Sequence, residues 1–237
     1  MFAVYLLAAT AKGVTGLGFS TTCLPFLVMT VGLKEALPLL LIPSVASNLQ
    51  VMYGAGGFRQ TVARFWPMFL ATIPGLLLGL WILGDADGAA LGAILGAVLL
   101  AYVAFAYANP NVRLPDGWER PLQPASGVLT GLLNGLTGSQ VMPSMPFLMA
   151  LDLDRNMFVQ AINCSFTLSS IIMAAGLVQL GLMTEGAVLV SAIGIIWATT
   201  GVRLGERIRH RLSPDQFRMA VLIMLAGMGV ALIMQGL

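Results

Sequence analysis

The segment Gly13-Val14-Thr15-Gly16-Leu17-Gly18-Phe19-Ser20-Thr21-Thr22-Cys23-Leu24-Pro25-Phe26-Leu27 has a counterpart beyond the middle of the chain. The counterpart reads Gly131-Leu132-Leu133-Asn134-Gly135-Leu136-Thr137-Gly138-Ser139-Gln140 and continues with Pro143-Ser144-Met145-Pro146-Phe147-Leu148. Glycines and prolines interrupt both apolar segments, so neither is expected to form a simple straight helix. Lipid cannot satisfy the backbone groups that such breaks free, and these groups must face protein or a water-filled cavity. Paired breaks of this kind indicate a binding site between two halves of a membrane transporter.

The composition of the chain sets the solvent in which it folds. Of its 237 residues, 58% are hydrophobic and 9% are charged, whereas a soluble domain carries about 25% charged residues. A soluble fold of this size cannot hide so much apolar surface, so we expect membrane lipid to surround the protein. The net charge of +2 is small and gives no reason to expect a nucleic-acid partner.

Long stretches without charge predict the membrane crossings, because a spanning helix needs about 20 apolar residues. The expected full crossings are 36–58, 65–84, 88–106, 156–181, about 186–206 and 219–237. The stretches 1–33 and 121–151 contain the two breaks and are expected to form broken helical hairpins.

Basic residues cluster in three connecting segments and predict the orientation. These clusters are Arg59 and Arg64, then Arg113 and Arg120, then Arg207, Arg209, Arg211 and Arg218. By the positive-inside rule all three lie in the cytoplasm, and the acidic turns at Asp85, Asp87 and Glu185 lie outside. Crossings 36–58 and 156–181 then run in opposite directions. The chain is therefore predicted to be an all-α membrane protein, a polytopic helical bundle of two inverted repeats, 1–108 and 122–237, joined by a cytoplasmic linker, 109–121.

This topology requires each hairpin to be re-entrant, entering and leaving on the same side of the membrane. The alternative is that both broken segments span fully, which makes the halves parallel. Further matches support a repeat: Pro25-Phe26-Leu27 matches Pro146-Phe147-Leu148, and Pro74-Gly75-Leu76-Leu77-Leu78-Gly79 matches Thr200-Gly201-Val202-Arg203-Leu204-Gly205. The glycines four residues apart in the last pair allow close helix contact.

The glycine pattern Gly13, Gly16, Gly18 with Pro25, repeated from Gly131, resembles the TauE/SafE sulfite exporter family. So does the ending Gly201-Val-Arg-Leu-Gly205-Glu-Arg-Ile-Arg-His-Arg-Leu-Ser213-Pro214. The resemblance implies secondary transport of sulfur-containing anions, such as sulfite or organosulfonates like sulfoacetate, across a bacterial inner membrane. Family members usually carry a run of glycines after the position of Gly18, where this chain has Phe19-Ser20-Thr21-Thr22. The departure leaves the particular anion open.

Two cations are candidates for binding an anionic substrate. Lys12 lies about 15 Å along the first helix at 1.5 Å per residue, near the middle of the bilayer. A charge at that depth costs about 3 kcal/mol, which an anion would offset; the alternative is a lysine that reaches back to the outer surface. Arg203 can hold two oxygens of a sulfonate at once. It also lies close to a cytoplasmic loop, where arginine is expected in any case.

The breaks supply neutral donors. If half-helices begin near Ser20 and Ser139, their free N–H groups point toward the membrane centre. The candidate substrate-binding residues at the breaks are Gly18, Ser20, Thr21, Thr22, Gly138, Ser139 and Gln140, together with the amides Asn48, Asn134 and Asn163. The alternatives are helix capping and bonding of buried amides across helices.

The sequence contains no Walker loop, nucleophile elbow, zinc motif or dinucleotide fingerprint. We therefore expect no enzyme activity, no cofactor and no metal site, and transport by alternating access, with one repeat moving against the other. The alternatives are an anion channel and a non-transport membrane assembly subunit. Glycine-rich helix faces are compatible with a homodimer.

Overall fold

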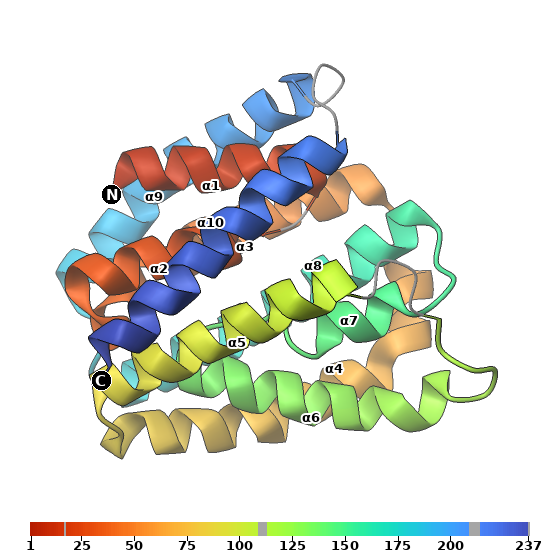
Figure 1. Cartoon of the computed structure of the whole chain (residues 1–237), viewed down its shortest axis with the longest axis horizontal. Helices are drawn as coiled ribbons and strands as arrows, with labels where there is room; N and C mark the ends of the chain where they lie inside the picture. The colour runs from red at the N-terminus through yellow and green to blue at the C-terminus, as the bar shows by residue number, and fades with distance from the viewer. Residues whose placement is uncertain (17, 109–112, 209–213, 237) are drawn as a thin grey trace.

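The computed structural model describes residues 1–16, 18–108, 113–208 and 214–236, and this part of the chain folds into ten α-helices without a strand (Figure 1). The helices of the first half are α1 (Phe2–Thr15), α2 (Phe19–Val31), α3 (Leu33–Ala55), α4 (Phe58–Asp85) and α5 (Gly88–Ala108). Those of the second half are α6 (Glu119–Thr137), α7 (Ser144–Met149), α8 (Arg155–Gln179), α9 (Glu185–Ile208) and α10 (Pro214–Gln235).

Five of these helices are long and apolar enough to cross a membrane: α3, α4, α5, α8 and α9. They correspond to five of the six predicted crossings. The sixth corresponds to α10, whose segment Val221–Gln235 is a shorter apolar helix, as are α1 and α2. The predicted all-helical class is confirmed, with five helices that are able to cross a membrane.

Several helix boundaries next to charged residues differ from the prediction. The first turn lies at Gly56 and Gly57, which have φ of 70° and 71°, so Arg59 and Arg64 belong to the start of α4 and not to a connecting segment. Helix α6 begins at Glu119, inside the expected linker. Both errors arise because charges were taken to end a helix, whereas long charged side chains at a helix end can reach beyond the apolar layer.

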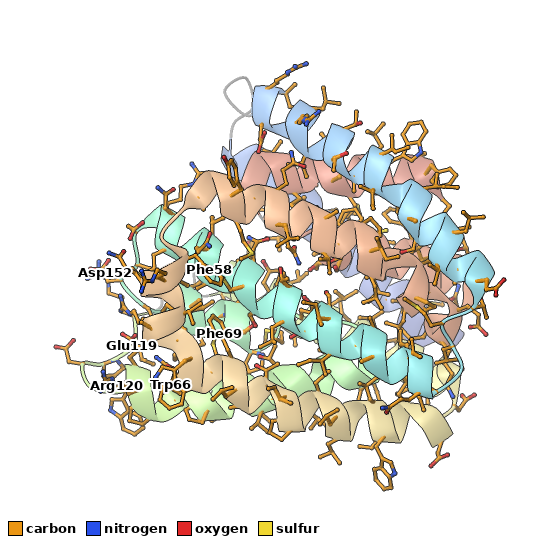
Figure 2. The ribbon with its side chains drawn as sticks, turned by 180° about the vertical axis from the view of Figure 1, so that it is seen from behind. Phe58, Trp66, Phe69, Glu119, Arg120 and Asp152 are labelled. Atoms are coloured by element: carbon orange, nitrogen blue, oxygen red, sulfur yellow. The ribbon has the colours of Figure 1, made fainter. Side chains whose placement is uncertain are left out.

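The starts of α4 and α6 lie at the same end of the molecule, with the connection between α7 and α8 (Figure 2). There Arg64 donates two hydrogen bonds of 2.7 Å to Glu119, from Nε and Nη2. This hydrogen bonding lowers the pKa of the Glu119 carboxyl group. Of the third basic cluster, Arg209 and Arg211 lie outside the described residues, as does the side chain of Arg218.

The main helix contacts join the two halves. Helix α1 packs along α9, α4 along α6, α5 along α10 and α3 along α8. Glycines allow the first two pairs to touch backbone to backbone. A Cβ atom built on Gly13 would lie 2.9 Å from Gly205 Cα, and one on Gly135 would lie 2.7 Å from Gly79 Cα. The core is therefore built from interlocked halves rather than from two separate bundles.

Asp154 caps the start of α8, the long helix of the second half. Its carboxylate accepts hydrogen bonds of 3.0 Å from the backbone N–H groups of Asn156 and Met157. Replacing an aspartate cap with alanine costs about 1 kcal/mol. We expect Asp154→Ala to lower the unfolding free energy in detergent by that amount. The exposed neighbour Asp152 is the control, and Asp152→Ala should leave stability unchanged; equal losses in the two variants would contradict the capping role.

Candidate functional site

Both repeated segments are interrupted at the glycines that the sequence singled out. Helix α1 ends at Thr15 with Gly16 as its C-cap, whose φ is 83°, and α2 begins at Phe19. Helix α6 ends at Thr137 with Gly138 as its C-cap, whose φ is 73°. A left-handed residue after a helix is a common C-cap, and glycine adopts it without steric cost. The two caps are alike: Gly16 N–H donates to Lys12 O at 2.6 Å, and Gly138 N–H donates to Asn134 O at 2.7 Å.

The two breaks differ in length. Helix α2 begins at Phe19, as predicted, with Gly18 at its N-cap. The prediction that a half-helix starts near Ser139 is wrong, because α7 begins at Ser144. Proline disfavours the helical conformation of the residue that precedes it. Pro143 therefore disfavours a helix that includes Met142. Ser139 and Gln140 consequently lie in the non-helical stretch before α7, and both are buried.

Each break lies against the long helix of the other half. A Cβ atom on Gly16 would be 3.2 Å from Val159 of α8, and one on Gly138 would be 2.3 Å from Leu37 of α3. Asn163 of α8 adds a polar contact, since its Nδ2 donates to Gly16 O at 3.2 Å. Because α3 and α8 also pack on one another, both breaks lie beside this central helix pair.

Lys12 is the only charged side chain in the buried set of the described residues, with an exposed fraction of 1%. Its ammonium group donates a hydrogen bond to Asn48 Oδ1 of α3. Within the described ranges it forms no ion pair with a carboxylate. A buried charge without a counter-ion is expensive, so an anion brought to this lysine would be strongly stabilised.

Hydroxyl and amide groups lie at the start of α2 and in the stretch between α6 and α7. Ser20 Oγ lies 2.8 Å from Ser44 Oγ of α3. Gln140 Nε2 donates to Ser170 Oγ of α8 at 3.2 Å. Thr22 is buried with Ser20, and Thr21 is partly exposed. Sequence reasoning did not select Ser44 or Ser170 as site residues, although a hydroxyl within a long apolar helix is a signal that could have singled out both.

Several buried polar atoms near the breaks have no hydrogen-bond partner within the described part of the chain. They are Asn48 Nδ2, both side-chain atoms of Asn134, Ser139 Oγ, Gln140 Oε1 and Asn163 Oδ1. Native proteins satisfy nearly all buried polar atoms. Unpartnered donors and acceptors on the helices that carry the two breaks and on the α3–α8 pair are therefore atoms that a polar ligand or ordered water could satisfy.

The comparison with protein families decides the classification. The family described as "Sulfite exporter TauE/SafE" matches residues 1–232. The chain belongs to this family. No curated protein and no solved structure matches. Family membership and the apolar helices together make this TauE/SafE protein an integral membrane protein and a transporter of sulfur-containing anions.

The second predicted cation of this TauE/SafE protein lies apart from the buried group. Arg203 is exposed on α9, while its neighbour Val202 is buried against α1. Leu77, which occupies the matching position of the first half, is exposed as well. No group of three or more histidine, cysteine, aspartate or glutamate side chains in the described residues could hold a metal ion.

Proposed function

We propose that this protein is a secondary transporter that moves a small sulfur-containing anion, sulfite or an organosulfonate, across the bacterial inner membrane by alternating access. The observation that carries the proposal is the buried ammonium group of Lys12, which has Asn48 as its hydrogen-bond acceptor and no carboxylate partner in the described ranges. An anion at this lysine would replace a neutral acceptor with a charged one. Charge-assisted hydrogen bonds are roughly twice as strong as neutral ones.

The three oxygens of a sulfonate or sulfite need several donors besides Lys12. The hydroxyls of Ser20 and Thr22, the amides of Asn134 and Gln140 and the hydroxyl of Ser139 are the proposed set. Helix α2 adds the free N–H groups and the partial positive charge of its N-terminus. Because Arg203 is exposed, we assign it no direct contact with the anion in this arrangement.

The paired packing supports two inverted repeats, α1–α5 and α6–α10, each opening with a re-entrant hairpin. The contact of α1 with α9 has its counterpart in that of α6 with α4. The last helices of the halves, α5 and α10, run in opposite directions side by side (Figure 1). Their contacts fit this direction, since Gly96 lies near Gly229 while Gly236 lies near Ala89.

The same packing favours a particular division of the moving parts. Backbone contacts at glycines join α1 to α9 and α4 to α6, and each pair combines one helix from each repeat. Moving one complete repeat against the other would therefore break both of these close contacts. We propose instead that a unit containing α1 and α9 moves against a unit containing α4 and α6. The breaks and the α3–α8 pair would then lie between the moving units, where access alternates.

The test is flux into liposomes that contain the purified full-length protein. Uptake of labelled sulfite and sulfoacetate should saturate with concentration, whereas lactate, chloride and taurine should not be taken up above the protein-free background. Uptake that rises linearly with concentration, together with single-channel current, would indicate a channel. Flux equal to protein-free liposomes for every sulfur anion would refute the proposal.

A further inference from the structure

The side chain of Lys12 has a neutral hydrogen-bond partner on a neighbouring helix. Lys12 of α1 is 1% exposed, and its Nζ donates to Oδ1 of Asn48, which is also 1% exposed and lies on α3. A neutral amine and an ammonium group both carry N–H donors, so either form can make this bond. The contact between Lys12 and Asn48 therefore accommodates the lysine with its extra proton or without it.

The helices around Lys12 bring no carboxylate to it in the described residues. Helix α1 packs on α9 and α2, reaches α3 through Asn48 and meets α8 through Asn163. The ionisable groups of these helices that are at least partly exposed are the Met1 amino group, Lys34, Glu35, Tyr53, Arg155, Glu185, Arg203, Glu206 and Arg207. The buried ones are Tyr5, whose hydroxyl donates to Leu39 O, and the thiols of Cys23 and Cys164. Thiols and phenols are mostly neutral near neutral pH, so only a bound anion can compensate a charge on Lys12.

Charge balance then restricts the forms of Lys12 that are favourable while it is buried. An ammonium group without an anion is an unpaired positive charge, and an anion beside a neutral amine is an unpaired negative charge. Both arrangements are costly inside a membrane protein. The neutral amine alone carries no net charge, and neither does an ammonium group paired with a singly charged anion.

We infer that Lys12 couples transport to protons, and that each singly charged sulfur anion crosses together with one proton bound to Nζ of Lys12. The inference rests on the proposed function and adds a co-substrate to it. The proton binds to Nζ from the water on the side where the anion enters. It leaves Nζ for the water on the other side when the anion is released, and no bond of the anion changes.

Two consequences follow for the driving force. Transport of a singly charged anion with one proton moves no net charge, so the membrane potential does not act on it. The proton and the anion each favour the binding of the other, because a coupling between two ligands is reciprocal. A pH difference across the membrane therefore drives the anion toward the less acidic side.

Methanesulfonate is the probe that tests this coupling, because its sulfonate carries one charge and takes up no proton near neutral pH. The full-length wild-type protein in liposomes that contain a pH-sensitive dye should take up labelled methanesulfonate and acidify the interior by one proton for each anion. An inside-negative potential should leave the initial rate unchanged. Uptake without acidification, or uptake slowed by that potential, would overturn the inference while the proposed function stood.

Lys12→Arg separates the charge from the proton, because a guanidinium group keeps its proton at every pH that a protein tolerates. The loaded site of this variant is neutral and can still cross, whereas the empty site keeps an unpaired charge. We expect exchange of labelled for unlabelled methanesulfonate to continue, and net uptake to fall relative to exchange by roughly tenfold or more. An equal ratio of net uptake to exchange in the variant and the wild-type protein would contradict the inference.

Lys34→Met is the control, because Lys34 lies at the start of α3 and donates to Gly84 O rather than to the buried group. It should keep both the rate and the proton count of the wild-type protein. If Lys12→Arg does not fold, the proton count of the wild-type protein decides. A wild-type protein that transports sulfite but not methanesulfonate is tested with sulfite, by the same ratio of net uptake to exchange in Lys12→Arg. Absence of uptake for every sulfur anion would instead refute the proposed function, and the inference with it.

Discussion

Replacing Lys12 with methionine is expected to weaken binding of the transported anion by roughly two to three orders of magnitude. Removing one partner of a buried charge pair costs about 3–5 kcal/mol, and each 1.4 kcal/mol is about tenfold in affinity. Methionine keeps most of the length and apolar volume of lysine, so the packing of α1 against α9 should survive. Titration of the purified variant with its best-bound sulfur anion measures the loss.

Two other cations serve as controls for Lys12→Met. Lys34 lies near the end of α4, where its ammonium group donates to Gly84 O at 3.1 Å, and Arg203 is exposed on α9. We expect Lys34→Met and Arg203→Met to bind the anion within about threefold of the wild-type protein, because screened surface charges contribute little. A larger loss in Arg203→Met than in Lys12→Met would transfer the charged contact to the arginine.

The second large effect concerns stability. Gly135→Ala should destabilise the fold by at least about 2 kcal/mol, even though alanine is the better helix former by about 1 kcal/mol. The added Cβ would lie 2.5 Å from Leu76 O and 2.7 Å from Gly79 Cα. Both are backbone atoms, so relief requires α4 and α6 to move apart along their length. Thermal unfolding in detergent measures the change.

Glycines in open positions provide the matched comparison. A Cβ atom on Gly54 or Gly227 would meet no atom within 4 Å. Gly54→Ala and Gly227→Ala should therefore leave the melting temperature unchanged or raise it slightly through helix propensity. If Gly135→Ala behaved like these two, close contact between α4 and α6 would not be a source of stability.

Much of the fold followed from the sequence because lipid imposes a simple rule on composition. Apolar length alone located five spanning helices, and glycine with proline located both interruptions. The position of Lys12 was also accessible, since a lone charge within an apolar helix is conspicuous. Its partner Asn48 was singled out only as a polar residue within a span, and the hydrogen bond between them depends on how α1 and α3 pack.

The delay of α7 until after Pro143 had a local signal in that proline, and the prediction did not use it. The remaining errors have a common cause. The pattern of residue types along the chain does not show which distant segments pack against one another. Nothing near Gly13 identified Gly205 as its contact, and Arg203 differs from a buried arginine only in the face of α9 on which it lies.

The backbone contacts between halves have a consequence for how the protein is made. During synthesis α1 leaves the ribosome long before α9, the helix that covers its glycine face. Helix α4 is likewise synthesised before α6, the helix that packs along it. Helix α1 must therefore remain without its closest packing partner until α9 has been translated, so the joining of the two halves is a late step of assembly.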